Sequence, residues 1–308
     1  MSAADAPATP AAATDSGRPA ATGSRRPGRR RRAYRALEPT RGGRAARGVL
    51  LAVASVLTIF PFYAMVVIAL KPETAIQFPQ SLLPWNLDTS AFSSVLSGQD
   101  MLRWTLNSLV YSGVSVILVL LLASMAGYAF AKKRFPGREA MFWSFLAMVM
   151  VPYHVTLIPT FIMMAKAGGV DTYWGLIVPS LANAQAVFLM RQFIKGLPDE
   201  LFEAARIDGA GEWRTFVTIV LPLCKPVLAT LGTFVFLWHW NDFLWPLIVA
   251  KSSDMWTLTV GIASLRQQQV PLSVVLAGSV VALVPIFAAY AVAQRSFQEG
   301  VAHTGIKG

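Results

Sequence analysis

The run from Gly48 to Leu70 spans 23 residues without one charged side chain. The hydrocarbon core of a bilayer is about 30 Å thick, and about 20 residues of apolar helix cross it. The rest of the chain follows the same trend, since only 14% of its 308 residues are charged, whereas soluble domains carry roughly 25%. These features exclude an ordinary soluble protein and predict a chain embedded in a membrane.

Six segments have the length and apolar character of membrane-spanning helices. They are residues 48–70, 107–131, 140–165, 173–190, 227–250 and 271–293. Prolines interrupt most of them, which neighbouring helices accommodate in a bundle but which is costly in an isolated span. We therefore predict an all-α membrane protein with six transmembrane helices and with both termini on one side.

The basic residues are distributed unevenly over the loops that these spans define. One side receives 22 of the 27 Lys and Arg residues, including eleven that precede Gly48. The other side receives Lys71, Arg103, Lys166, Lys251 and Arg266. Because cytoplasmic loops carry the excess of basic residues, we expect both termini in the cytoplasm. The net charge of +11 then serves orientation and does not indicate nucleic-acid binding.

Residues 1–47 are rich in Ala, Pro, Gly, Ser, Thr and Arg and have no apolar period. Such a segment buries too little surface to offset the entropy of ordering, and we expect a disordered basic cytoplasmic tail. Arg25-Arg26 suggests a twin-arginine export signal, but the run at Gly48 is too long for the apolar part of a signal. Residues 48–308 form the membrane domain, with 71–106 as a loop on the outer side.

The sequence contains no arrangement of residues typical of an enzyme. His154, His239 and His303 lack metal-ligand spacing, and neither a phosphate-binding loop nor a nucleophile elbow is present. The single cysteine, Cys224, excludes an intrachain disulfide. We expect no catalytic residue, no metal and no cofactor. For His154 and His239, which lie in predicted spans, we favour neutral imidazoles bonded across helices over a functional site.

A short helix is predicted between the fourth and fifth spans, within about 196–222. Pro198 suits its first position and Gly209 suits a left-handed stop. At 100° per residue its apolar side chains form two adjacent stripes, with Leu197, Leu201 and Ala204 on one and Phe202 and Ala205 on the other. A helix of about eleven residues is too short to be stable alone, so it needs a surface on which to dock.

The residues around this helix resemble the EAA loop of bacterial ABC importer permeases. The matching positions are Glu203-Ala204-Ala205, Asp208-Gly209-Ala210, Phe216, Ile219 and Leu221-Pro222. Other segments are similar to maltose-type carbohydrate permeases, namely Asn107 to Leu109, Ala126 to Arg138, Val155 to Pro159, Asp171 to Leu176, Trp240 to Pro246 and Gln298 to Gly308. The resemblance covers about 48–308 and implies the type I ABC importer permease fold, with a cytoplasmic coupling helix.

The resemblance also implies partners and a place in the cell. This chain is similar to the smaller, six-helix member of a permease pair, so we expect a heterodimer with a second permease subunit. Two ATP-binding subunits would energise it, an extracytoplasmic solute-binding protein would deliver the solute, and the bacterial cytoplasmic (inner) membrane would hold it. ATP-driven closure would move the docked helix as a lever, and the fifth span would carry that motion into the bilayer.

Five residues of the coupling helix receive roles from the resemblance. Glu203 is expected to make the polar docking contact, Ala204 and Ala205 to permit close approach, Asp208 to cap or pair locally, and Gly209 to set the turn. The alternative is an ordinary surface helix, in which Glu203 and Arg206 form an exposed pair worth about 0.2 to 0.5 kcal/mol.

Asp242 is the one acidic residue within a predicted span. Burying a charge in lipid costs at least about 2.5 to 3.5 kcal/mol, so this side chain should face a cavity or a partner helix. Aromatic rings stack on sugar rings, and carboxylates accept hydrogen bonds from hydroxyls. The candidates for a solute path are therefore Asn183, Gln185, Asn241, Asp242 and Trp245. An interfacial aromatic belt, with Asp242 bonded to a neighbouring subunit, is an equal alternative.

We therefore expect a transport subunit for a sugar or sugar-like solute. A permease for glycerol phosphate esters is one alternative, and it would need a positively charged path, whereas no Arg lies within a span. A channel or scaffold membrane protein, whose helix docks something other than an ATPase, is an alternative of another class. The sequence identifies neither the solute nor a function for Cys224-Lys225.

Overall fold

The computed structural model describes residues 41–72, 76–98 and 100–304. Within these ranges every regular element is a helix, in agreement with the predicted all-α class. The chain divides into two units, residues 1–58 and 59–308. Most of the expected tail, residues 1–40, lies outside the described residues.

The described part of the first unit is the beginning of α2 (Arg41–Ala69). The helix starts before the expected position at Gly48, since residues 41–47, which include three arginines, form its first turns. Aliphatic side chains such as Val49, Leu50 and Leu57 are exposed. Exposure of an apolar helix is favourable where lipid, and not water, surrounds it.

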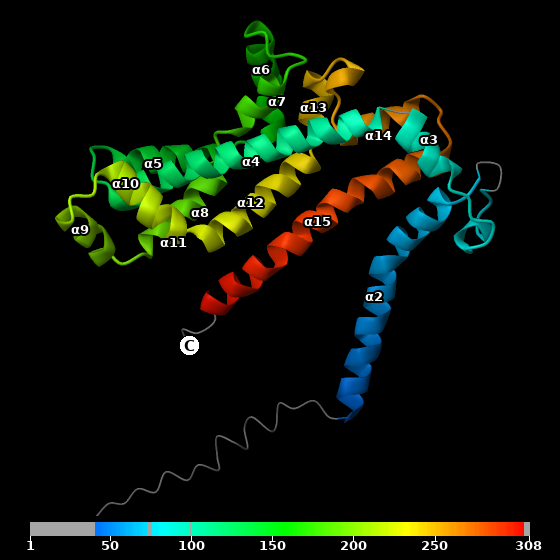
Figure 1. Cartoon of the computed structure of the whole chain (residues 1–308), viewed down its shortest axis with the longest axis horizontal. Coiled ribbons are helices and arrows are strands. Elements are labelled where there is room, and N and C mark those ends of the chain that lie inside the picture. Colours follow the sequence, from blue (N-terminus) through cyan, green and yellow to red (C-terminus); the bar gives the residue numbers. More distant parts are fainter. Residues whose placement is uncertain (1–40, 73–75, 99, 305–308) are drawn as a thin grey trace, which may run out of the picture. The chain divides into compact units, whose positions relative to one another are not determined.

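The second unit is built around α4 (Met101–Lys132), the long helix that runs through it in Figure 1. Helices α8 (Ala184–Lys195) and α12 (Lys225–Trp240) pack on α4, and α15 (Leu272–Thr304) packs on α12. The backbones of α4 and α8 approach closely at Gly127, where an added Cβ would lie 2.7 Å from the Cβ of Met190. Small residues permit this kind of close packing between membrane helices.

Three pairs of helical segments bend sharply at short breaks. The first joins α5 (Arg138–Ala147) and η3 (Met148–Met150) to α6 (Tyr153–Lys166) at 102°. The second joins α7 (Tyr173–Ile177) and η4 (Val178–Ser180) to α8 at 48°. The third joins α10 (Glu212–Thr215), the π-helical turn η5 (Phe216–Val220) and α11 (Leu221–Leu223) to α12 at 77°.

The described helices allow three membrane spans, or up to six if each bent pair forms one span. Six is the number that the sequence predicts. The expected fifth span, however, ends at Trp240 and not at 250, because the chain leaves the helix at Asn241 and begins a separate helix, α13 (Leu244–Val249). Asp242 lies in this break.

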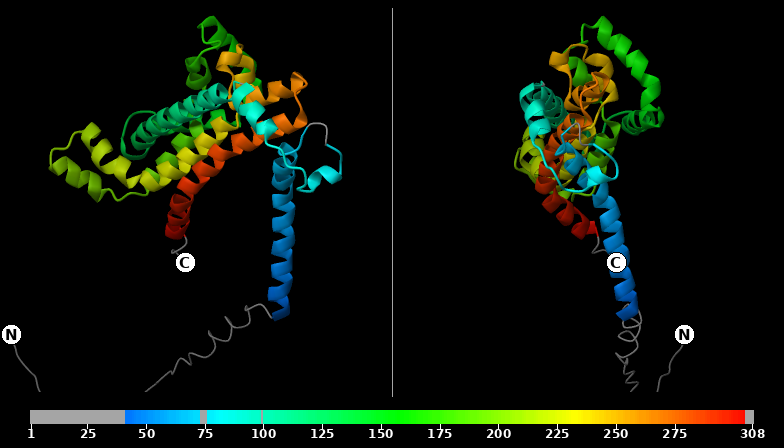
Figure 2. Two further views of the ribbon diagram at one scale, coloured as in Figure 1. Left: turned by 45° about the vertical axis from the view of Figure 1, so that its right-hand side comes forward. Right: turned by 90° about the vertical axis from the view of Figure 1, so that its right-hand side faces the viewer.

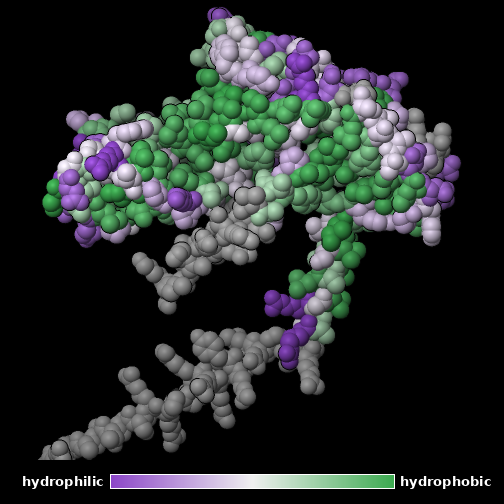
Figure 3. All heavy atoms as spheres, in the orientation of Figure 1, coloured by the Kyte–Doolittle hydropathy of each residue, from purple (hydrophilic) through white to green (hydrophobic). Residues whose placement is uncertain are grey.

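The hydrophilic residues of the second unit gather toward its two ends. In Figures 1 and 2, α9 (Glu200–Ile207) and α10 lie at one end, whereas α3 (Ser90–Gly98), α13 and α14 (Leu258–Gln267) lie toward the other. On the face drawn in Figure 3, hydrophobic side chains cover the middle, over α4. This distribution is the one expected of a bundle that crosses a bilayer. Two further short helices are η2 (Gln80–Leu82) and η6 (Ser253–Met255).

Asp171 fixes the connection between α6, α7 and α13. It adopts a left-handed conformation with φ of 61°, which Asp tolerates better than most residues. Its Oδ1 accepts hydrogen bonds of 2.9 Å from the backbone N–H groups of Lys251 and Ser252. Its own N–H donates to the carbonyl of Val249 at 2.9 Å. The predicted motif Asp171 to Leu176 therefore joins two segments that lie about eighty residues apart in the sequence.

Candidate functional site

Helix α9 is shorter than the sequence predicts. It has eight residues, Glu200–Ile207, and follows Pro198 and Asp199. Gly209 has φ of 73°, which confirms the predicted left-handed stop. The N–H of Ala210 donates to the carbonyl of Ala205 at 2.8 Å, and this bond closes the end of the helix.

One face of α9 is buried against its own subunit. Phe202 and Ala205 are 6% and 5% exposed, and they form one of the two predicted stripes. Opposite them at 100° per residue lie Glu203, Ala204 and Ile207, all exposed. Ile207 is 85% exposed, and the sequence reasoning did not single it out. The small size of Ala205 thus serves contact within the chain, while Ala204 faces outward.

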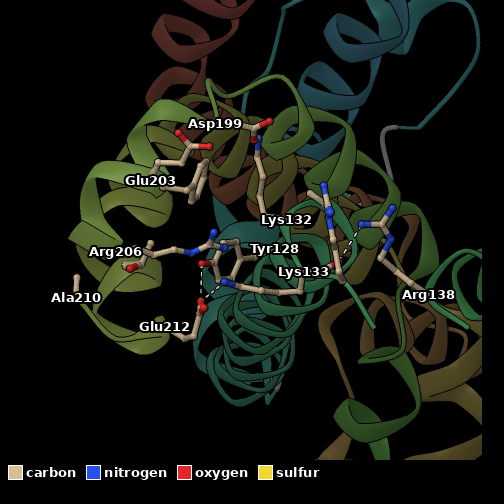
Figure 4. Close-up of a pocket in the computed structure, with 13 residues that line it drawn as sticks. Tyr128, Lys132, Lys133, Arg138, Asp199, Glu203, Arg206, Ala210 and Glu212 are labelled. Atoms are coloured by element: carbon tan, nitrogen blue, oxygen red, sulfur yellow. Dashed lines mark hydrogen bonds and ion pairs between the residues drawn. The ribbon is translucent and has the colours of Figure 1, made fainter. Parts of the chain in front are cut away.

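A cavity of about 610 Å³ lies between α9 and the end of α4. Figure 4 shows Asp199 and Glu203 on the side of α9, with Tyr128, Lys132 and Lys133 on the side of α4. The cavity is lined by charged and aromatic residues, including Arg134, Arg138, Phe202, Arg206 and Glu212. Among the predicted coupling residues, Glu203 alone lines it.

Two ion pairs connect α4 with the segments on either side of α9. Lys132 Nζ lies 2.6 Å from Asp199 Oδ1, and Lys133 Nζ pairs with Glu212 Oε2. The hydrogen bond from Lys132 lowers the pKa of the Asp199 carboxyl below its ordinary value. Burial alone would lower the pKa of Lys133, but its bonds to Glu212 and Tyr128 raise it. In each pair the lysine thus stabilises the charged form of its carboxylate partner, since the hydrogen bond from Lys133 likewise lowers the pKa of Glu212.

A second cavity, of about 590 Å³, collects most of the residues proposed for the solute path. Asn183, Gln185, Asp242 and Trp245 all line it. Asn241 is absent from the lining, and its amide donates to the carbonyl of Leu237 on its own helix at 2.8 Å. The cavity lies among α4, α6, α8, α12 and α13.

Asp242 is held by contacts within the chain. The phenolic O–H of Tyr111 on α4 donates a hydrogen bond to Asp242 Oδ2 at 2.9 Å, and the backbone N–H of Trp245 lies 3.5 Å from Oδ1. Trp245 in turn donates its indole N–H to the carbonyls of Gly175 and Leu176 at 3.2 Å. Asn183 caps α8, since its Oδ1 accepts from the N–H of Ala186 at 2.9 Å. The Asp242 carboxylate therefore has a hydrogen-bond partner, Tyr111, within its own chain. The alternative of an interfacial aromatic belt had placed its partner in a neighbouring subunit.

Tyr111 is a site residue that the sequence did not predict, and His239 was predicted only as a neutral imidazole bonded across helices. Tyr111 is 1% exposed within an apolar helix, so nothing in the local pattern distinguishes it from a core residue. His239 is buried, and its Nδ1 lies 2.7 Å from the carbonyl of Val235 on the same helix. The sequence predicted a bond to another helix, and the structure shows one within α12 instead. Its Nε2 has no hydrogen-bond partner among the described residues. His154 is exposed and contacts Tyr153 edge-on.

The cavity around Asp242 has no positive side chain. None of its lining residues is Lys or Arg, and the described part of the chain holds no group of three or more His, Cys, Asp or Glu residues that could bind a metal ion. The polar groups in the lining are one carboxylate, the amides of Asn183 and Gln185, the imidazole of His239 and hydroxyls, and they lie among aromatic and aliphatic side chains. Such groups bind hydroxyls well and anions poorly.

An apolar helical bundle with charged ends, and with a carboxylate and two amides lining a cavity, is typical of a multi-pass membrane transport protein. Residues 119–299 match the family described as "Binding-protein-dependent transport system inner membrane component". The chain belongs to this family of ABC importer permeases. It is the permease component of such a system and not an enzyme.

Two relatives and one solved structure illustrate the similarity. The arabinooligosaccharides transport system permease protein AraQ of Halalkalibacterium halodurans is 38% identical over 257 residues, covering 82% of this chain and 92% of AraQ. The sn-glycerol-3-phosphate transport system permease protein UgpE of Rhizobium meliloti is 32% identical over 267 residues, covering 83% and 95%. A chain from a bacterial ABC transporter that imports the acidic polysaccharide alginate matches with a TM-score of 0.75 at 24% identity, over 83% of this chain and 98% of that one, which shows the shared fold.

Proposed function

We propose that the chain is the transmembrane permease subunit of an ATP-driven importer that carries a sugar or sugar-like solute across the cytoplasmic membrane. The observation that carries the proposal is the cavity in which the Asp242 carboxylate and the amides of Asn183 and Gln185 are gathered among mostly apolar side chains. A second permease subunit completes the pathway as a heterodimer, two ATP-binding subunits hydrolyse ATP, and an extracytoplasmic solute-binding protein delivers the solute. Both termini and α9 lie on the cytoplasmic side, where the basic residues are concentrated.

The exposed face of α9 is the surface that docks on an ATP-binding subunit. Ile207 supplies an apolar contact, since burial of such a side chain contributes about 1.5 to 3 kcal/mol, and its exposed fraction of 85% leaves it free for a partner. Glu203 and Ala204 flank it on the same face and supply a polar contact and close approach. Asp208 and Gly209 form the turn that ends the helix. Ala205, buried in this subunit, holds α9 in place.

The solute is an uncharged, hydroxyl-rich molecule. Asp242, Asn183 and Gln185 provide acceptors and donors, and the exposed indole of Trp238 provides a face for a sugar ring. A glycerol phosphate ester would meet a carboxylate and no cation in this cavity. Among the two kinds of relative, the arrangement therefore favours the arabinooligosaccharide permeases over the glycerol-3-phosphate permeases.

Uptake into proteoliposomes tests the proposal. The chain is reconstituted with its permease partner, ATP-binding subunits and binding protein, and labelled neutral oligosaccharides and glycerol 3-phosphate are offered in turn. We expect uptake of a neutral sugar that requires both ATP and the binding protein. Uptake of glycerol 3-phosphate alone would show that the assigned solute is wrong. A complex with no ATPase stimulation would support the channel or scaffold alternative.

The docking surface has its own test. Ile207→Asp should release the ATP-binding subunits from purified membranes, because a buried unpaired charge costs about 3 to 5 kcal/mol, whereas Ile207→Leu should retain them. Lys195→Glu is the control for a charge change on the same side, since this lysine is exposed at the end of α8. Normal retention of the ATP-binding subunits by Ile207→Asp would contradict the assignment.

A further inference from the structure

Two adjacent lysines at the end of α4 contact the chain on both sides of α9. Lys132 contacts the segment before α9. Its Nζ donates to the carbonyl of Leu197 at 2.7 Å and to Asp199 Oδ1 at 2.6 Å. Lys133 contacts the segment after α9, through its ion pair with Glu212. The two pairs therefore bracket the eight residues of α9, as Figure 4 shows.

Aromatic side chains fill the space between the two pairs. The ring of Tyr128 stacks on Phe202 with centroids 6.1 Å apart and packs on Phe216 at 5.9 Å. The ammonium of Lys132 lies 4.8 Å from the Phe202 centroid, and that of Lys133 lies 4.7 Å from the Tyr128 centroid. Cation–π contacts of this kind are stronger where water is partly excluded, and the Lys132 side chain is 9% exposed.

Tyr128 ties the charged and aromatic contacts into one network. Its hydroxyl donates to Glu212 Oε2 at 2.9 Å, so Glu212 accepts bonds both from α4 and from Lys133, the residue that follows the helix. Tyr128, Phe202 and Phe216 also belong to one buried cluster that includes Met190 of α8. α9 is thus fixed to α4 by ion pairs, by hydrogen bonds and by packing.

Two routes lead from α9 toward the cavity around Asp242. One follows the chain through α10, η5 and α11 into α12, and it contains a π-helical turn and a bend of 77°. The other is α4, one unbroken helix of 32 residues that carries both Lys132 and Tyr111. At 1.5 Å per residue these two side chains are separated by about 32 Å along the helix. Rigid, packed helices can carry coupling between distant sites, and α4 provides such an element without a break.

We propose that Lys132 and Lys133 are positioning residues that fix α9 to α4, so that a displacement of the docked α9 reaches Tyr111 and Asp242 along α4. This inference rests on the proposed docking of α9. It assigns to α4 a part of the mechanical coupling that the sequence reasoning gave to the fifth span alone. The route is physically continuous, because Tyr111 is bonded directly to Asp242.

Swapping the two charged residues of the Lys133–Glu212 pair in the reconstituted importer tests the inference. Lys133→Glu and Glu212→Lys are made singly and together, and the ratio of solute imported to ATP hydrolysed is measured. Residues in contact have interaction energies equivalent to a change of about two- to a hundredfold in an equilibrium constant. Each single variant should therefore lower the ratio of solute imported to ATP hydrolysed by at least about fivefold. The double variant should recover most of it. Lys195→Glu is the matched control, because it reverses an exposed lysine on the same side.

A second pair of variants separates positioning from folding. Lys132→Arg keeps a donor for Leu197 and Asp199 and should preserve the ratio, while Lys132→Met should lower it with membrane abundance and ATP-subunit retention unchanged. A wild-type ratio in both Lys132→Met and Lys133→Glu overturns the inference. If Ile207→Asp still releases the ATP-binding subunits in that case, the docking proposal stands and only the route through α4 fails.

Discussion

Tyr111 and Asp242 lie 131 positions apart in the sequence and are joined by one hydrogen bond of 2.9 Å, from the phenolic hydroxyl to Oδ2. The bond connects the middle of α4 with the break between α12 and α13. Because a carboxylate inside an apolar bundle requires a partner, Tyr111 explains how Asp242 is accommodated. The free side of the carboxylate lines the cavity that we assign to the solute.

Asp242→Asn should lower uptake by about tenfold to a hundredfold, since hydrogen bonds to charged groups contribute about 1.5 to 3 kcal/mol. Basal ATP hydrolysis should change much less, because the shape of the side chain is retained. Tyr111→Phe should weaken uptake in the same direction. Transport and ATPase assays on one preparation give both values. Loss of assembly with the second permease in Asp242→Asn would instead show a structural role.

Gly209→Val should uncouple uptake from ATP hydrolysis. Its φ of 73° is unfavourable for a β-branched residue by about 1 to 2 kcal/mol or more, so the turn after α9 should move. Gly209→Asn is the control, since Asn tolerates this conformation and no atom lies within 4 Å of an added Cβ. Glu203→Lys should have the same effect as Gly209→Val through charge. Wild-type coupling in both Gly209→Val and Glu203→Lys would contradict the assigned docking of α9.

Gly127→Ala should destabilise the isolated subunit by about 1 to 3 kcal/mol, because the new Cβ would lie 2.7 Å from Met190 Cβ and 3.0 Å from the backbone nitrogen of Arg191. Gly113→Ala on the same helix has open space around it. It should stabilise α4 by about 0.5 to 1 kcal/mol. Thermal unfolding in detergent compares the two, and equal melting temperatures would contradict the close approach of α4 and α8.

Asp171→Ala should destabilise the contact between the α6–α7 loop and the segment after α13 by about 1 to 3 kcal/mol, since it leaves the backbone donors of Lys251 and Ser252 without their acceptor. Burial alone would raise the pKa of the Asp171 carboxyl, but its bonds from Ser252 and Lys251 lower it. Its stabilising charge is therefore complete above the unfolded value of about 3.9 and is lost as the pH falls through the lower folded value. Melting temperatures from pH 7 to below pH 4 should show this loss in the wild type and not in Asp171→Asn.

Reporter fusions should give a cytoplasmic signal at positions 135, 205 and 305 and an external signal at 88, 168 and 260. The expectation follows from six spans and from the 22 basic residues on one side against five on the other. A membrane-impermeant thiol reagent applied to a single-cysteine variant at the exposed position 195, on the same side as α9, gives an independent measurement. Labelling from outside the cell would reverse the orientation and remove α9 from the reach of an ATP-binding subunit.

The sequence alone predicted the membrane class, the approximate spans and the existence of α9. These features depend on local properties, namely runs of apolar residues, the positions of charges and the conformational freedom of Gly209, and each can be recognised without knowing which segments meet. The motif around Glu203 likewise identified the family, because its residues are contiguous.

Only the tertiary structure decided which side chains meet. The pairs Tyr111 with Asp242, Lys133 with Glu212 and Lys132 with Asp199 join residues 131, 79 and 67 positions apart, and no local pattern specifies such contacts. The same holds for the two stripes of α9, since both are apolar in sequence and only packing against Tyr128 selects the stripe of Phe202 for burial. Local chemistry thus determined the elements, whereas the packing of α4 against its neighbours determined the cavity and the contacts of α9.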